Sequence, residues 1–434
     1  MKSSKINFFF IWFISLTISG IAQEKRCGAA QYDSLLSRRY ANWVFQRRAL
    51  QDSVTAHLNQ NRRKARVGDI CANIRIPVVV HVIHDNPAGQ TGGRDNPNIS
   101  DAQIQNQIRI LNEDYRRKTG TPGFNNNAVG TDTGIEFYLA NVDPNGQRST
   151  GITRHNYPQK TNFSILSDDQ LISEIVSWPT DRYLNIWTAR FGNGTFLGIS
   201  QFPSVSGVQG LDKSTELLER SDGVFIDFRV FGTGGSVVSR LYKLGRTTTH
   251  EVGHWLGLIH TWGDTFCGDD YCADTPVSEG GNQGVTCGPI FSNCTGTRTR
   301  NMTENYMDYS PDSCMNVFTK NQAERMKAVL EKAPRRARLV RYWCAQLPFG
   351  SQLQLDIYPN PAVKDLNFKV TLKEFDTFDI EVFDLTGKLI YQSQFVNYPS
   401  WVVNLSAADV APGAYLVRVR TKDESVTKRL IISR

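Results

Sequence analysis

The stretch THEVGHWLGLIHTWGD, residues 249–264, places three histidines and a glutamate within eleven positions. His250 and His254 are four residues apart, so a helix projects them from one face, one turn apart. Imidazoles at that spacing can share a zinc ion. Gly257 follows three residues later and can take the left-handed conformation that ends a helix, so that the turn brings His260 back as a third ligand. These positions constrain the chain to a helix that ends in a tight turn around a metal ion.

Three protein ligands indicate a catalytic rather than a structural zinc site. They leave the fourth position open to water, whereas structural zinc is closed by four protein ligands. Zinc lowers the pKa of its bound water towards about 7, and Glu251 can take the proton as the water attacks a carbonyl. A helix with ordinary core histidines is the alternative, and the added Gly257 and His260 make it the weaker interpretation.

Two segments resemble a known family. HEVGHWLGLIH matches the metzincin metallopeptidase signature H-E-x-x-H-x-x-G-x-x-H, and NYMDYSPDSCMNVFTKNQAERM resembles the Met-turn region of the pappalysin family. The resemblance covers residues 27–345. It implies that Met307 forms the apolar floor beneath the zinc and that Tyr309 approaches the metal and stabilises the tetrahedral intermediate. An ordinary core methionine is the alternative for Met307.

The same resemblance assigns specificity to Asp312, which is expected in the pocket just past the scissile bond. A carboxylate there forms a charge-assisted bond to the Arg or Lys of a substrate, which an apolar side chain cannot replace. A solvated loop aspartate is the alternative.

Acidic residues gather between the two motifs, and their spacing suits calcium. They are Asp264, Asp269, Asp270 and Asp274, next to Thr275. The family resemblance implies structural calcium here, and Asp270, Asp274 and Thr275 are the predicted ligands. A polar loop held by disulfides is the alternative.

Eight cysteines in an exported chain are expected mostly to pair. The resemblance implies the disulfides Cys267–Cys294 and Cys287–Cys314. It leaves Cys71, Cys272 and Cys344, an odd number, without an assigned pairing.

Cys27 stands apart in the triplet Arg26-Cys27-Gly28 near the N-terminus. A thiolate is a strong zinc ligand, and in the fourth position it would exclude water. The triplet resembles the cysteine switch that keeps metzincin zymogens latent. A stray cysteine, or a partner for one of the odd three, is the alternative.

Further on, NRRKAR (61–66) predicts self-activation by cleavage before Arg62, Arg63 or Arg66.

The N-terminus predicts a secretory signal peptide over residues 1–22. Lys2 and Lys5 precede an apolar run over residues 8–18, and small residues follow up to Ala22. The run has about half of the roughly 20 apolar residues that a membrane span needs.

The formal charge of +7 does not indicate a nucleic-acid partner. Residues 1–22 contribute +2, and residues 23–70 contribute +6 from ten Lys/Arg and four Asp/Glu, so the remainder sums to −1. The positive charge thus lies in segments that we expect to be removed.

The pattern along the chain predicts an α+β domain. Strand candidates such as IRIPVVVHVIHD, GIEFYLANV, YLNIWTARF and GVFIDFRVF come first. Helices are expected over residues 100–118, with Ser100 as N-cap, over 247–258 and over 320–332. The metzincin resemblance implies a twisted mixed sheet, the active-site helix and an irregular C-terminal subdomain with the Met-turn.

The last part of the chain predicts a small all-β sandwich of short alternating strands. Its segments IYPNPA, DLTGKLIY and PGAYLVRVRT resemble the sorting domain of type IX secretion. The resemblance rests on Tyr358-Pro359-Asn360-Pro361, Gly387-Lys388 and Gly413 with Tyr415. A carbohydrate- or surface-binding module is the alternative.

We therefore expect a secreted zinc endopeptidase made as a latent zymogen, exported through the periplasm to the medium or the cell surface. The expected parts are a signal peptide (1–22), a propeptide with the cysteine switch (23–66), a metallopeptidase domain (67–346) and a sorting domain (347–434). Its expected partners are protein or peptide substrates, its own propeptide as inhibitor and the type IX machinery. A metal-dependent cell-wall amidase and a catalytically silent zinc-binding surface protein are the alternatives.

Overall fold

The computed structural model describes residues 26–61, 74–192, 196–205, 215–283, 286–346, 353–363, 365–406, 410–421 and 424–433. The predicted signal peptide, the proposed cleavage sites at residues 62–66, Cys71 and the side chain of Cys344 lie outside this described part. No helix within it is long and apolar enough to cross a membrane.

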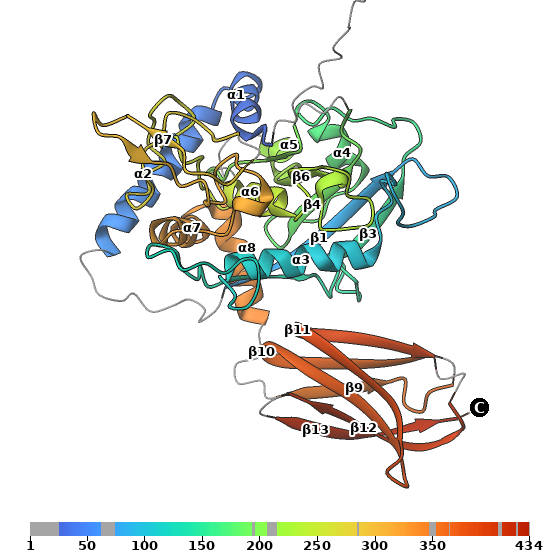
Figure 1. Ribbon diagram of the computed structural model, residues 1–434. Coiled ribbons are helices and arrows are strands. Elements are labelled where there is room, and N and C mark those ends of the chain that lie inside the picture. The colour runs from blue at the N-terminus through green and yellow to red at the C-terminus, as the bar shows by residue number, and fades with distance from the viewer. Residues whose placement is uncertain are drawn as a thin grey trace, which may run out of the picture.

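Two helices precede the first strand and lie on the surface of the domain that follows (Figure 1). They are α1 (Ala29–Arg39) and α2 (Trp43–Asn61). Helix α1 contacts the edge of the main sheet, whereas α2 runs along α7 (Lys320–Lys332) on another side. The segment that the sequence predicts as a propeptide is therefore folded and docked on the domain that follows it.

The catalytic domain is built on a mixed sheet, as the fold prediction required. The strands are β1 (Ile74–His84), β2 (Ile135–Leu139), β3 (Ile152–Asn156), β4 (Leu184–Ala189), β5 (Gly198–Ser200) and β6 (Gly223–Asp227). Their order is β2-β1-β4-β6-β5, with β3 also paired to β1. All pairings are parallel except that of β5, which runs antiparallel to β6 at the edge. The central strand β1 is buried along most of its length because its β-branched residues pack into apolar clusters on both faces of the sheet.

Helices α3 (Asp101–Tyr115) and α6 (Arg246–Trp255) contact each other, and α6 also packs against β5 and β6. Ser100 caps α3 as expected, because its side chain accepts a hydrogen bond from the backbone N–H of Gln103. Helix α6 is buried at every position, which places the histidine motif inside the domain. The smaller elements are α4 (Asp169–Ile175), α5 (Thr215–Arg220), η2 (Phe228–Val230), β7 (Phe291–Ser292), β8 (Thr299–Arg300), η3 (Asp312–Cys314) and α8 (Pro334–Gln346).

The C-terminal strands form a separate all-β body (Figure 1). They are β9 (Gln354–Tyr358), β10 (Asp365–Asp384), β11 (Leu389–Ser406), β12 (Gly413–Arg420) and β13 (Ser425–Ile432). Strand β10 pairs with β9 through residues 367–371 and with β12 through residues 379–384. The inward side chains make a core of their own around Phe368, Phe378 and Val417.

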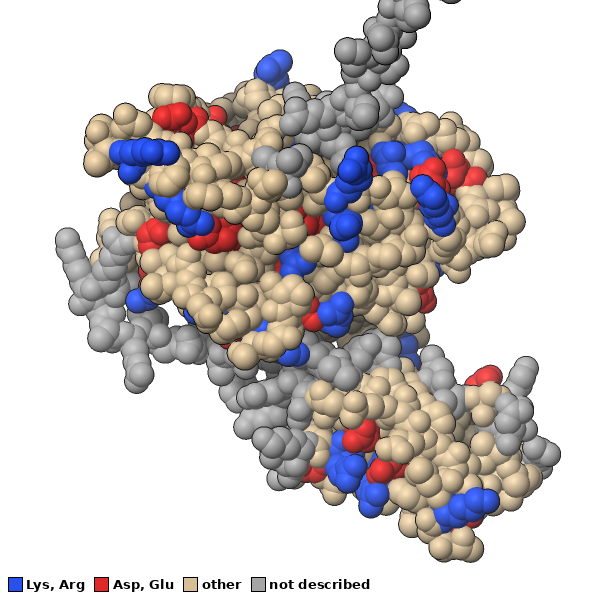
Figure 2. All heavy atoms as spheres, viewed as in Figure 1, with Lys and Arg blue, Asp and Glu red and all other residues tan. Residues whose placement is uncertain are grey.

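The surface carries no single field of charge on the face that Figure 2 shows. Lys and Arg side chains lie scattered among Asp and Glu side chains there.

Candidate active site

Three histidine rings converge at one point inside the domain. His250 and His254 project from one face of α6, and the chain turns at Gly257, whose φ of +87° is open to glycine, to return His260. The three Nε2 atoms lie 3.0, 3.1 and 3.2 Å apart. Ligands bound tetrahedrally at about 2.0–2.1 Å are separated by about 3.3–3.4 Å, so the set fits one metal ion.

The other ring nitrogens of the two helical histidines are held by backbone carbonyls. Nδ1 of His250 donates to the Tyr306 carbonyl at 2.6 Å, and Nδ1 of His254 donates to the Leu258 carbonyl at 2.8 Å. These bonds fix the tautomer that leaves Nε2 free to ligate. Burial lowers the pKa of both histidines well below the usual value, which keeps the rings neutral as ligation requires.

His260 has a carboxylate partner instead. Its Nδ1 bonds to Asp264, and its ring stacks on Trp262 with centroids 4.4 Å apart. Burial opposes ionisation of Asp264, but His260 outweighs it and holds the pKa of the carboxyl below its usual range. Asp264 belongs to the predicted acidic cluster, and its role as the partner of His260 was not predicted. Its position four residues after the third histidine was the available signal.

Cys27 completes the cluster. Its Sγ and the three histidine nitrogens lie within 4.8 Å of one another, and all four residues are buried. The backbone N–H of Gly28 donates to Gly198 of β5 at 3.0 Å, which fastens this segment to the sheet edge. The Ala29 N–H donates to Sγ at 3.2 Å. Burial, with the nearby Glu251, raises the pKa of the thiol, and a bound cation is what would favour the thiolate here.

Glu251 lies on α6 beside the edge strand β5. A Cβ at Gly198 would fall 2.7 Å from the Glu251 Cγ, so glycine is needed for this close approach. Burial raises the pKa of Glu251 to about 8, although Cys27, Arg26 and Ser200 each act to lower it. A carboxyl that titrates near neutrality suits proton transfer in both directions.

Met307 packs against the helix that carries two of the histidines, and Tyr309 contacts the cluster directly. A Cβ at Gly253 would fall 2.5 Å from the Met307 sulfur, so this buried side chain packs directly under α6. The Tyr309 hydroxyl donates to the Cys27 carbonyl at 3.2 Å, and the ring meets His260 edge-on at 4.9 Å. Burial raises the pKa of Tyr309, which keeps the hydroxyl a donor.

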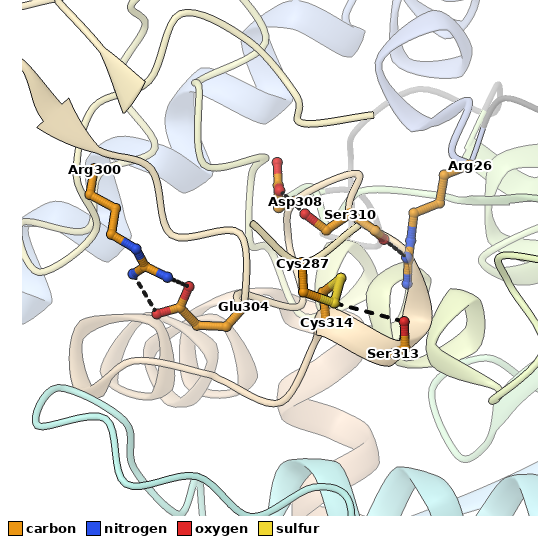
Figure 3. Close-up of a disulfide and its surroundings, with 8 residues drawn as sticks. All are labelled: Arg26, Cys287, Arg300, Glu304, Asp308, Ser310, Ser313 and Cys314. Carbon is orange, nitrogen blue, oxygen red and sulfur yellow. Dashed lines mark hydrogen bonds and ion pairs between the residues drawn. A yellow bond between two sulfur atoms is a disulfide. The ribbon is translucent and has the colours of Figure 1, made fainter. Parts of the chain in front are cut away.

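Asp312 is buried and holds the arginine that precedes Cys27. Arg26 Nη1 lies 3.3 Å from its Oδ1 with both side chains fully shielded, and the Leu244 N–H donates to its Oδ2 at 2.8 Å. The same Nη1 donates to the Ser310 carbonyl at 2.7 Å (Figure 3). The Arg26 guanidinium also lies 5.2 Å from the centroid of the Tyr242 ring.

Asp308, between the two Met-turn residues, is another position that the sequence reasoning missed. Its carboxylate accepts from the backbone and side chain of Asn282 at 3.0 Å. It also accepts from the Ser310 hydroxyl at 2.6 Å, a contact that Figure 3 shows. It therefore ties the Met-turn to the loop before β7 and helps to position the Ser310 carbonyl, which accepts a hydrogen bond from Arg26. Nothing in the residue pattern distinguished this aspartate from its neighbours.

The loop region between α6 and α7 carries the two disulfides that the resemblance implied. Cys267 is bonded to Cys294 and Cys287 to Cys314, the second shown in Figure 3. Cys272 is a buried free thiol. Because Cys314 follows Asp312 by two residues, the second disulfide braces the pocket that holds Arg26.

The predicted calcium ligands are divided between two sets of contacts. Asp270 accepts from the Thr275 hydroxyl at 2.8 Å, and burial raises the pKa of Asp270 to about 7. Asp274 instead accepts from Thr319 at 2.6 Å and from the N–H of Asn321 at 2.9 Å, at the start of α7. Among the residues that the structure describes, Cys27 and the three histidines are the one group of three or more His, Cys, Asp or Glu side chains placed to hold a metal ion. Calcium stays a prediction.

Comparison with known proteins agrees with this geometry. A family model described as "Pregnancy-associated plasma protein-A" matches residues 238–331, and one described as "Secretion system C-terminal sorting domain" matches residues 356–433. An extracellular metalloprotease of Arthroderma benhamiae is 31% identical over 281 residues, covering 64% of this chain and 86% of that protein. Extracellular metalloprotease 1 of Coccidioides posadasii is 31% identical over 264 residues, covering 60% and 78%.

Two solved structures from Tannerella forsythia are also similar. A point mutant of promirolysin is 37% identical with a TM-score of 0.59, covering 74% of this chain and 99% of that one. Mature mirolysin in complex with a cleaved peptide is 40% identical with a TM-score of 0.54, covering 64% and 98%. The chain is a secreted member of the pappalysin family of metzincin metalloproteases and carries a C-terminal sorting domain for type IX secretion.

Proposed function

We propose that the chain is a zinc endopeptidase made as a latent zymogen, in which Cys27 occupies the fourth ligand position. The convergence of one cysteine sulfur and three histidine nitrogens carries this proposal. Sulfur and imidazole nitrogen are the donors that zinc takes in proteins, and four of them close the site. The proposed boundaries are those of the sequence analysis, with the prosegment at residues 23–66, the catalytic domain at 67–346 and the sorting domain at 347–434.

The residues around the cluster have separate roles in the proposed reaction. Zinc, when bound, polarises a carbonyl and acidifies water. Glu251 takes the proton of the attacking water and later delivers it to the leaving amine, which its raised pKa favours. Tyr309 donates its hydroxyl to the developing oxyanion. Its present bond to the Cys27 carbonyl supports that role, because the acceptor is a peptide oxygen close to the histidines.

Arg26 supports the proposed preference for Arg or Lys after the scissile bond. Its guanidinium fills the place that Asp312, the Ser310 carbonyl and the Tyr242 ring create together. A buried carboxylate without a cationic partner is costly, so the pocket selects a cation in any peptide that enters it.

The direction of the prosegment explains how it can occupy this pocket without serving as a substrate. From Arg26 to Cys27 the chain runs from the Asp312 pocket towards the histidines. A substrate with arginine just after the scissile bond must run the other way, from the metal towards the pocket. The Arg26–Cys27 peptide is therefore presented in reverse and blocks the site.

The test is to map the new termini that the activated protein makes in a denatured protein. We expect cuts before Arg or Lys that a chelator abolishes and that added zinc restores. The Glu251→Ala form, purified in the same way, is the matched inactive control. An absence of cuts in the denatured protein, with release of peptides from cell wall instead, would overturn the proposal in favour of the amidase.

Self-activation and calcium are further parts of the proposal. Glu251→Ala protein should keep its prosegment in the absence of added protease, and loss of residues 23–61 from it would remove the need for self-cleavage.

Calcium at Asp270, Asp274 and Thr275 should raise the melting temperature of the zymogen over a magnesium control. An unchanged melting temperature would contradict it.

A further inference from the structure

One face of helix α2 is buried against the catalytic domain. This helix lies far from the three histidines in the sequence. Trp43, Gln46, Leu50 and Val54 are its buried residues, at helical spacing. Leu50 and Val54 belong to a small apolar cluster of their own, separate from the cores around the active site. Its other buried members are Ala328, Val329 and Ala333, on α7 and just after it. We call Arg325, Ala328, Val329, Glu331 and Ala333 the α7 surface.

Polar contacts flank this apolar strip and fix the register of α2 along α7. Arg325 Nη2 donates to the Gln51 side-chain oxygen at 2.7 Å. His57 Nε2 lies 2.9 Å from a carboxylate oxygen of Glu331, about one and a half helical turns further along α2. An apolar strip at helical spacing with polar contacts beside it is typical of a specific helix-docking site.

The α7 surface adjoins the turn that carries the third histidine without including a metal ligand. Arg325 Nε donates to the Gly257 carbonyl at 2.8 Å, and a Cβ at Gly257 would fall 2.6 Å from a methyl of Val329. The surface therefore packs on the turn that carries His260, and it follows the predicted activation cuts in the chain.

The prosegment is thus held at two places joined by its own backbone. Arg26 and Cys27 hold one end at the cluster, and α2 holds the other on α7. The predicted activation cuts at residues 62–66 follow α2, so they leave both attachments intact. When two attachments share one chain, either can rebind before the other dissociates, and release is slowed beyond what each provides alone.

We propose that the α7 surface of the mature enzyme is a binding site for α2 of the excised prosegment. Residues up to 61 then stay on the enzyme as a non-covalent inhibitor after the chain is cut, and activation needs a second step of release. This inference rests on the proposed latency, and it adds an attachment that does not use the metal. Leu50 and Val54 supply its apolar contact, and Gln51 and His57 make the polar contacts beside them.

The test separates cutting from release. In the Glu251→Ala chain, residues 62–66 are replaced by the recognition sequence of a site-specific protease, and that protease makes the cut. Gel filtration with mass spectrometry then follows the cut prosegment. We expect it to co-elute with the catalytic domain, and to do so in Cys27→Ala protein as well.

Substitutions on α2 locate the attachment. The pair Leu50→Ala and Val54→Ala should speed release on the order of 100-fold, and Val54→Ala alone about 10-fold. Phe45→Ala is the matched control, because Phe45 lies on the same helix but is 67% exposed. It should release at the rate of the parent. Thermal melts of the uncut chains confirm that each variant is folded.

Two outcomes overturn the inference. In one, the cut prosegment leaves the parent protein as soon as the linker is cleaved. In the other, the Leu50/Val54 variants release at the rate of Phe45→Ala. Since the Glu251→Ala chain has no need to hydrolyse anything, these results are independent of the peptidase test. A protein that cuts before arginine but loses its prosegment at once would contradict the α7 surface alone.

Discussion

In the proposed function, Asp312 binds first Arg26 of its own chain and then the basic residue of a substrate. Both uses depend on one buried carboxylate whose Oδ2 is already held by the Leu244 N–H. Because the backbone N–H fixes the carboxylate, its free edge faces the incoming guanidinium with little reorganisation.

Substitution of Asp312 by Asn should therefore weaken both interactions. We expect kcat/KM for peptides with arginine after the scissile bond to fall by roughly 100- to 5,000-fold, since a buried charge without its partner costs about 3–5 kcal/mol. The kcat/KM for peptides with an apolar residue after the scissile bond should change little. The comparison of the two peptide series in parent and variant checks this. An equal loss in both series would make Asp312 a structural residue instead.

At this scale the sequence predicts those residues whose spacing is itself the signal. The helical interval of four between His250 and His254, and the glycine that allows the turn to His260, follow from backbone geometry alone. Asp308 could not be separated from other loop aspartates, because its partners come from a folded loop with no periodicity, whereas Asp264 is marked only by its interval of four from His260. The role of Arg26 required its side chain to be placed beside Asp312, 286 positions away.

At the scale of elements, the metal centre depends on the way α6 ends. Gly257 takes a φ of +87° at a point where Val329 of α7 leaves no room for a side chain. The end of the helix and its packing against α7 therefore act together to position His260.

Gly257→Ala should destabilise the zymogen and reduce its metal content. The strained backbone and the clash with Val329 together cost about 2–5 kcal/mol. Gly146→Ala is the control, because Gly146 also has a positive φ, +79°, but faces open space. This control should lose only the stability that a left-handed backbone costs a residue with a side chain, about 1–2 kcal/mol. Metal analysis and thermal melts of both variants decide, and full metal content in Gly257→Ala would contradict the argument.

The contact between α3 and α6 includes a buried ion pair that gives the fold a pH dependence. Asp114 accepts from the Thr249 hydroxyl at 2.7 Å and lies 3.4 Å from Arg246. Burial raises the pKa of Asp114 to about 6 even though Arg246 acts to lower it. The folded state thus holds this proton more tightly than the unfolded state, whose carboxyl titrates near 3.8.

The sign follows from this difference. The contribution of protonated Asp114 to the stability of the folded state is fully present below about pH 4 and is lost as the pH rises through about 6. Asp114→Asn does not titrate, so the stability of the variant relative to the parent should improve by up to about 3 kcal/mol between pH 4 and pH 7. Denaturant unfolding of both proteins in the Glu251→Ala background measures it. A stability difference that stays constant across this range would refute the role of Asp114.

The elements themselves differed in how far they could be predicted. Strands β1, β2, β4 and β6 are long or strongly apolar, and the sequence identifies them. Strands β3 and β5 were missed, since β3 is polar and β5 has three residues. Strand β5 nevertheless places Gly198 against Glu251 and binds the segment with Cys27. Its strand conformation comes from pairing with β6, a tertiary contact that local pattern cannot reveal.

At the scale of the whole molecule, the sorting domain and the catalytic domain have separate cores. The cluster around Phe368 and Val417 shares no residue with the clusters around the active site. The linker between the two parts follows α8. Separate cores imply that each part folds on its own.

Removal of residues 347–434 should therefore abolish export without abolishing the enzyme. We expect the truncated chain to accumulate in the periplasm, to bind metal and to cleave peptides once its prosegment is released, because the described site draws no residue from the sandwich. Fractionation of cells that express the full and the truncated chains, with a periplasmic marker to detect leakage, measures export. Activity assays on the extracted truncated protein test the second half. Truncated protein in the medium at the level of the full chain would mean that the sandwich acts after export, as the surface-binding alternative requires. Truncated protein that is retained but unfolded would instead mean that the catalytic domain needs the sandwich as a folding partner, against the separation of their cores.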